Sequence, residues 1–439
     1  MKLVRLLTLF GFALPAFAQY AGPAILSRGE APAAMTAPEI KFRPFVEFSA
    51  GYETSLAGVA VSDSQGTLSN ASSYDLLLSW GVSGSHRWKH TKLGLDYRGS
   101  LSGFLQQSGY DSVSESLLMS ISHQITRHIS LSLAESAGIF TRAFGQGSLS
   151  QTISFDPSQG YIPTTDFFDN RTYYLITQVG LTIQETARLS FHLGGGNFLT
   201  RYRAHGLVGT NGLSANGDVQ YRLNRRSTIG ASYNYGHFGY SGQFGAADVH
   251  GVAGTYSRAL ASKLELSASL GASRIEQKFI QQVAVDPVIA ALLGVSSTAE
   301  ISHFVTWTPT GSARLSQVFH QGVASLSAGR AVLPGNGLFI TSYSDTVAVG
   351  YTYTGVRRWS LSSFASYDRS QSVANFIGAY SDVSGGLSAS RQIARFVHVV
   401  FGYDVRKYNS PDFHNYNRAV QEGHFGIGFT PGDVPLRIW

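Results

Sequence analysis

The sequence contains no cysteine, and only 14% of its 439 residues are charged. The lack of cysteine excludes disulfide scaffolds, cysteine nucleophiles and thiolate metal sites. Beyond the first 18 residues there is no apolar run long enough for a membrane-spanning helix, which needs about 20 residues. Lysine and arginine form no long run, so the net charge of +6 does not indicate a nucleic-acid partner.

Motifs for catalysis and for metal binding are also missing. No serine has glycine two residues before and two residues after it, and there is no HExxH, Walker or GxGxxG motif. The 13 histidines are scattered, so they indicate no metal site. We therefore expect neither enzymatic activity nor a cofactor. A Ser/His pair assembled from distant positions, as in a membrane-embedded hydrolase, is the one enzymatic alternative.

The N-terminal segment is typical of a secretory signal. Residues 1–18 combine a basic start, an apolar stretch and the sequence Ala16-Phe17-Ala18, which fits an A-x-A cleavage site. Residues 19–41 are rich in Ala, Pro and Gly and are expected to form a flexible periplasmic linker. The sequence thus predicts an exported protein.

The rest of the chain is rich in glycine and aromatic residues, with 48 Gly, 27 Phe and 22 Tyr, and it alternates with a period of two. Near the C-terminus, for example, Phe401, Tyr403 and Val405 alternate with Gly402 and Asp404. The polar phase carries small and charged residues that a dry core does not accept without partners. The apolar phase suits a surface that faces lipid.

Tight, often basic turns recur at about eight places, each following and preceding an alternating segment. Of the 13 prolines, only Pro309 interrupts a proposed strand. The pattern predicts one transmembrane antiparallel β-barrel over residues 42–430, of about 18 strands (roughly 16 to 20), with short periplasmic turns and long external loops. The rival fold is a soluble exported β-sandwich or β-solenoid, which would bury the apolar phase.

The longest expected connection runs from about Ala143 to Asn170. With this loop and its repeated hairpins, the chain resembles the general and substrate-selective porins of Gram-negative outer membranes, whose third loop folds into the lumen. The likeness is one of architecture over nearly the whole mature chain, without a family-specific sequence motif. It implies a pore constriction in which loop acids face luminal arginines: Asp156, Asp166 and Asp169 opposite Arg98, Arg142, Arg222 or Arg406. The alternative is an ordinary surface loop whose acids bind divalent ions or water.

Aromatic residues cluster near the ends of the proposed strands, which indicates two aromatic girdles at the membrane interfaces. By the tight turns these are Trp88, Tyr221, Tyr256, Tyr353, Trp359 and Phe396. Toward the loops they are Tyr202, Tyr240 and Tyr408. The alternative is a stacking track for carbohydrate inside the pore.

The C-terminal residues 431–439 are expected to form a tail that ends in Trp439. Many outer-membrane barrels end in an aromatic residue that the barrel-assembly machinery recognises. Here the alternation Phe425-x-Ile427-x-Phe429 stops ten residues before the end of the chain. The insertion signal is therefore either this motif or the tail.

The expected function is passive diffusion of small hydrophilic solutes or ions through a porin-like channel in a Gram-negative outer membrane. Because the polar phase carries charges of both signs, we expect weak selectivity. Membrane lipid, lipopolysaccharide and the assembly machinery are the expected partners, and an oligomer is possible. The alternative is a non-channel barrel in surface-polysaccharide export, attachment or envelope assembly.

Overall fold

The computed structural model describes eleven stretches of the chain. They are residues 42–56, 71–105, 111–140, 171–203, 207–241, 245–284, 297–334, 340–353, 355–373, 379–411 and 417–431. Within these stretches no helix has the length and hydropathy required to cross a membrane.

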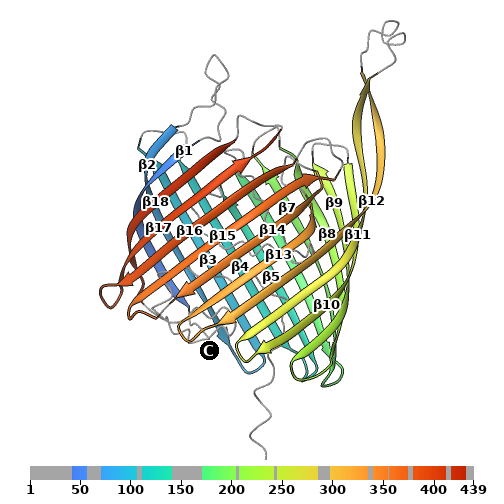
Figure 1. The fold of residues 1–439 in the computed structure, drawn as a ribbon, viewed down its shortest axis with the longest axis horizontal. Helices are drawn as coiled ribbons and strands as arrows, with labels where there is room; N and C mark the ends of the chain where they lie inside the picture. The colour runs from blue at the N-terminus through green and yellow to red at the C-terminus, as the bar shows by residue number, and fades with distance from the viewer. Residues whose placement is uncertain are drawn as a thin grey trace, which may run out of the picture.

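Eighteen antiparallel strands form one closed barrel (Figure 1). They are β1 (Arg43–Leu56), β2 (Ala71–Arg87), β3 (Thr91–Phe104), β4 (Ser112–Gln124), β5 (Ile129–Phe140), β6 (Thr172–Gln184), β7 (Leu189–Tyr202), β8 (Gly209–Arg222), β9 (Ser227–Ser241), β10 (Gly245–Ala261), β11 (Leu264–Ala284), β12 (Ser297–Val318), β13 (Gly322–Leu333), β14 (Ser342–Tyr353), β15 (Trp359–Ser372), β16 (Tyr380–Gln392), β17 (Val397–Asn409) and β18 (Arg418–Phe429). Each strand pairs with its neighbours in sequence, and β1 also pairs with β18, which closes the barrel. The predicted fold and strand number are confirmed.

The period-two alternation separates an outer face from a lumenal face. On β17, Phe401 is 48% exposed, whereas Val400 beside it is only 5% exposed. Cross-strand partners keep the same phase, so Phe401 lies opposite Phe425 of β18, and Phe425 lies opposite Ala50 of β1. Large apolar side chains therefore cover the outside of the barrel, and such a surface requires lipid.

Aromatic side chains form a band on the outer face at the end of the barrel that carries the short turns. Tyr221, Tyr256, Tyr353 and Trp359 point outward there. Trp88 and Phe396 lie in the short turns themselves, and the Phe396 ring lies 6.1 Å from the ring of Phe429. This arrangement fits the girdle expected beside the tight turns.

The three tyrosines expected in the loop-side girdle lie on the other face. Tyr202, Tyr240 and Tyr408 occupy lumenal positions, and Tyr240 and Tyr408 are buried. A lipid-facing role does not fit them, because the phase of the strand decides which face a ring occupies. Other aromatic rings are exposed on the outer face toward the loops: Tyr52, Tyr74, Tyr173, Tyr367 and Trp307.

Strand β12 leaves the barrel wall near its middle. Its ladder with β13 runs only from Val318 to Gly311, while its ladder with β11 continues to Ser297. The long β11–β12 hairpin consequently rises above the rim (Figure 1). Pro309 lies two residues beyond the last β12–β13 pair. Proline lacks the N–H that a ladder needs, and Pro309 lies where β12 has no ladder partner on β13.

The two faces of β16 provide a matched test of the membrane-spanning barrel. Leu387 is 58% exposed on the outer face, and Ser388 beside it points into the lumen. We expect Leu387→Arg to destabilise the inserted barrel by about 2–4 kcal/mol, because it places a charge against lipid. Ser388→Arg should cost much less. Heat-modifiable electrophoretic mobility after refolding into vesicles measures the folded fraction of each variant. Equal losses of folded protein in the two variants would contradict the assignment of faces.

Candidate functional site: the barrel lumen

The lumenal wall is built largely from serine and threonine. Serines on neighbouring strands share hydrogen bonds, as between the hydroxyls of Ser269 and Ser312 at 2.8 Å and those of Ser366 and Ser384 at 2.6 Å. Small hydroxyl side chains leave room inside the barrel and can also hydrogen-bond to water. This wall is therefore suited to contact with polar solutes.

Part of the lumen is instead apolar. A cluster of buried side chains, the lumenal cluster, joins the inner faces of β6, β7, β9, β10 and β11 to the loop ends of β13 and β15. It consists of Tyr174, Ile176, Phe198, Phe238, Tyr240, Ala247, Val249, Ile275, Val332 and Val373. Phe238 is fully buried, and its ring lies 5.7 Å from that of Phe198. Such packing requires that the end of β13 turn inward from the wall.

Hydrogen bonds fix this inward-turned part, which consists of residues 331–334 and 340–343. The Tyr240 hydroxyl and the Thr341 hydroxyl lie 2.5 Å apart, and the Thr210 hydroxyl lies 3.4 Å from the Pro334 carbonyl oxygen. The Val373 amide donates to the carbonyl of Thr341 at 3.0 Å. The contacts of Tyr240 and Thr210 join segments more than 100 residues apart in sequence. The inward-turned part therefore narrows the loop-side half of the lumen.

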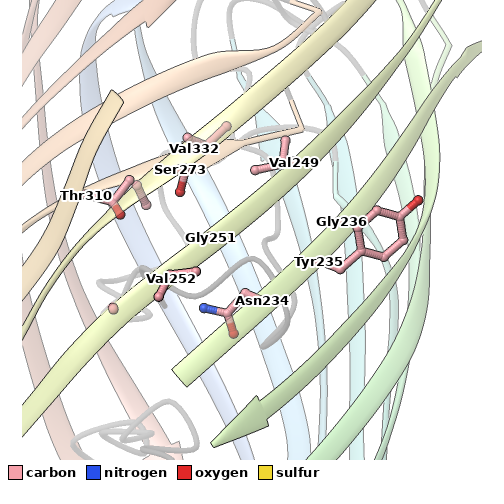
Figure 2. Close-up of a pocket in the computed structure, with 11 residues that line it drawn as sticks. Asn234, Tyr235, Gly236, Val249, Gly251, Val252, Ser273, Thr310 and Val332 are labelled. Atoms are coloured by element: carbon pink, nitrogen blue, oxygen red, sulfur yellow. The ribbon is translucent and has the colours of Figure 1, made fainter. Parts of the chain in front are cut away.

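A small cavity lies where β12 and β13 part (Figure 2). Its volume is about 50 Å³, and Ser273, Thr310 and Val332 are among the residues that line it. A cavity of this size accommodates only a few water molecules. Val332 thus nearly fills the gap left by the departure of β12, so the cavity is too small to be a binding site for a larger solute.

The residues expected to form a constriction are only partly described. Asp156, Asp166, Asp169 and Arg142 lie outside the described residues. Arg98, Arg222 and Arg406 all face the lumen, but they lie at different heights. They are Arg98 near the middle of β3, Arg406 toward the loops, and Arg222 at the short-turn end of β8. The three arginines therefore do not form one ring.

Two of these arginines have carboxylate partners on the lumenal wall. Arg98 Nε lies 3.1 Å from Asp96 Oδ1, and Arg406 Nε lies 3.0 Å from Asp382 Oδ2. The partners come from the strand wall, whereas the sequence-based hypothesis paired these arginines with loop acids. No group of three or more His, Asp or Glu side chains within the described stretches is arranged to hold a metal ion.

Charges on the lumenal wall are separated by height. Among the lumenal strand residues whose side chains are described, the loop-side half carries six carboxylates and one arginine: Glu53, Asp75, Asp368, Asp382, Asp404 and Glu422, with Arg406. Asp96 and Arg98 form an ion pair near the middle of β3. The short-turn half is mixed and carries more bases than acids: Arg43, Arg87, Lys92, Arg222 and Arg314, with Glu47, Asp218 and Glu265. The expectation that charges of both signs are interspersed holds only for the short-turn half.

Packing in the lumenal cluster can be tested at Phe238. We expect Phe238→Ala to destabilise the barrel by about 3–5 kcal/mol, because it opens a cavity in a closely packed cluster. Phe425→Ala on the outer face, where lipid can fill the space, should cost less. Urea unfolding in vesicles measures both. In a Val332→Cys background, Phe238→Ala should also speed thiol labelling, and unchanged labelling would contradict the proposed contact.

No family model matches the chain, and no curated protein matches its sequence. Among solved structures it is similar to OccK5 (OpdH) of Pseudomonas aeruginosa, with 13% identity, a TM-score of 0.41, and coverage of 92% of this chain and 100% of that chain. OccK2 (OpdF) of the same organism, solved in complex with glucuronate, has 10% identity, a TM-score of 0.43, and coverage of 90% and 99%. A BenF-like porin from Pseudomonas fluorescens Pf-5 has 10% identity, a TM-score of 0.41, and coverage of 90% and 99%.

Proposed function

We propose that this chain is an outer-membrane channel for the passive diffusion of small hydrophilic solutes or ions. The observation that carries the proposal is the polar lumenal phase of a closed barrel of 18 strands whose outer face is apolar. Barrels of about 16 to 18 strands leave an aqueous channel. The hydroxyl groups and charges of the wall provide hydrogen bonds to water and to polar solutes in transit.

The inward-turned part limits the size of the solutes. It occupies the loop-side half of the lumen and is held by the lumenal cluster and by the hydrogen bond between Tyr240 and Thr341. A fixed obstruction of this kind favours small solutes over large ones. We further propose that Arg98 and Arg406, each beside an aspartate, contact solutes as they pass.

The location follows from the same physical properties. Only helices and closed barrels satisfy their backbone hydrogen bonds within lipid. We propose that residues 1–18 direct export and are removed after Ala18, that residues 19–41 form a linker, and that residues 431–439 follow the barrel as a tail. Lipid, lipopolysaccharide and the assembly machinery are the proposed partners. The short turns would then face the periplasm and the loops the exterior.

The alternative is a barrel that does not conduct and serves polysaccharide export, attachment or envelope assembly. The observation that favours it is the inward-turned part, because a filled lumen would block diffusion. A measurement of conductance distinguishes the two functions.

We expect the purified protein to form steady, ohmic channels in planar lipid bilayers, because a polar lumen holds water and ions. Val332→Gly together with Phe238→Ala should raise the single-channel conductance, since both changes loosen the inward-turned part. Leu326→Ala, on the outer face of β13, is the matched control and should leave conductance unchanged. Absence of any conductance from correctly folded protein would reject the channel and favour the alternative.

A further inference from the structure

The carboxylates of the loop-side half lie directly beside one another. Asp404 of β17 is the register partner of Glu422 of β18, and Glu422 is in turn the register partner of Glu53 of β1. On the next strands, Asp368 and Asp382 are also register partners. All five residues occupy the lumenal phase of their strands, so they form an acidic arc along β15–β18 and β1, in which Glu53, Asp382 and Glu422 are buried and Asp368 and Asp404 are partly exposed.

Like charges directly opposite each other destabilise a sheet. A row of three carboxylates at neighbouring positions therefore has a cost that a purely structural wall would avoid with serine, as it does at Ser366 and Ser384. Arg406 offsets part of the charge through its contact with Asp382 at 3.0 Å. Among the described lumenal side chains of this half, acids therefore outnumber bases, and such a surface attracts positive charge.

Asp75 of β2 extends the arc, because it is the register partner of Gly51 on the lumenal face of β1. Its side chain is 5% exposed, and its Oδ1 atom has no hydrogen-bond partner among the described residues. Gly51 of β1 makes this position accessible, because a Cβ there would lie 2.5 Å from that oxygen. The Asp75 carboxylate thus lies against Gly51 on the lumenal face of β1, two residues from Glu53. A buried acceptor without a donor is costly, and a cation that passes along the arc would relieve that cost.

Asp404 has a similar position at the other side of the row. Its carboxylate lies over Gly386 of β16, where a Cβ would approach within 2.2 Å of Asp404 Oδ1. Glycine at both Gly51 and Gly386 therefore leaves space for the carboxylates of Asp75 and Asp404. The opposite wall of this half, on β4 to β14, has no charged side chain at the described lumenal strand positions. The field in this half of the lumen is consequently one-sided.

We propose that this acidic arc, formed by Glu53, Asp75, Asp368, Asp382, Asp404 and Glu422, is a cation-selecting filter at the loop-side entrance of the channel. The inference rests on the proposed function, because a filter requires conduction. Rings of Asp and Glu favour cations in channels, and a cleft lined by one sign of charge concentrates the opposite ion. The substrate class is therefore small cations, both inorganic monovalent ions and small organic ammonium or guanidinium compounds.

The filter passes cations and does not retain them. The acids lie along a curved wall, and none of the described His, Asp and Glu side chains form a chelating group of three. Below the arc, the short-turn half carries more bases than acids, which weakens the attraction there. Conduction requires binding strong enough for entry and weak enough for release. A cation would be concentrated at the entrance and released toward the opposite end.

The experiment measures the reversal potential of the full-length protein in planar bilayers under a KCl gradient. Wild-type protein should be cation-selective. Asp75→Asn combined with Asp404→Asn should lower the permeability ratio of K⁺ to Cl⁻ by about threefold or more, because two charges of the arc are lost. The matched control is Glu135→Gln on β5, since Glu135 points outward in phase with the exposed Leu131 and Leu133. That control should leave the ratio unchanged.

The outcomes separate this inference from the proposed function. If wild-type protein conducts but shows no preference for K⁺, or if the double variant keeps the wild-type ratio, the filter is rejected while the channel stands. If folded wild-type protein does not conduct, the channel itself is rejected. Should the double variant fail to fold, as judged by heat-modifiable mobility, each single variant is measured instead. Arginine influx into vesicles, compared with glutamate influx, extends the test to organic ions and should favour arginine.

Discussion

Closure of the hydrogen-bond ladder is the constraint on which this structure depends. Lipid offers no hydrogen bonds, so every strand edge within the membrane requires a partner. The pairing of β1 with both β2 and β18 provides the last of these partners. Closure also gives each strand an inside and an outside, and a shift of one residue would exchange them. The apolar outer face and the polar lumenal face therefore follow from one register around the whole ring.

The same constraint explains where the ring is imperfect. Above Gly311 and Arg330 the β12–β13 ladder stops, and β12 continues as one strand of a hairpin beyond the rim. On the outer face, just at this level, Arg330 and Asp345 form an ion pair with Nε–Oδ1 and Nη2–Oδ2 distances of 2.6 and 2.9 Å. An outward ion pair is costly against lipid, so we infer that water reaches this level and can satisfy the unpaired edges of β12 and β13.

The fold could be predicted from the sequence because alternation and proline placement are local signals. The alternating segments between the tight turns indicated about 18 strands, and nearly all prolines fell outside these segments. The prediction that Tyr202, Tyr240 and Tyr408 face lipid was wrong. These residues lie near strand ends, but the phase of the strand decides which face a side chain occupies, and their phase is lumenal. The lumenal cluster was missed since Phe238, Ile275 and Val332 meet only through tertiary packing. Separation of charge by height depends on the register between strands, which single-strand patterns do not contain.

The lumen therefore combines two features that a uniform polar phase would not show. Apolar residues on β6–β11 hold the end of β13 inside, and this removes space from one side of the loop-side half. The acids lie on the other side, on β15–β18 and β1–β2, so in the proposed channel a solute displaced by the obstruction would travel along the carboxylates. In a narrow aqueous path beside low-dielectric protein, the field of a fixed charge is screened less than in bulk water. In the proposed channel, narrowing and charge would thus act together, because the obstruction would bring each solute within reach of the acids.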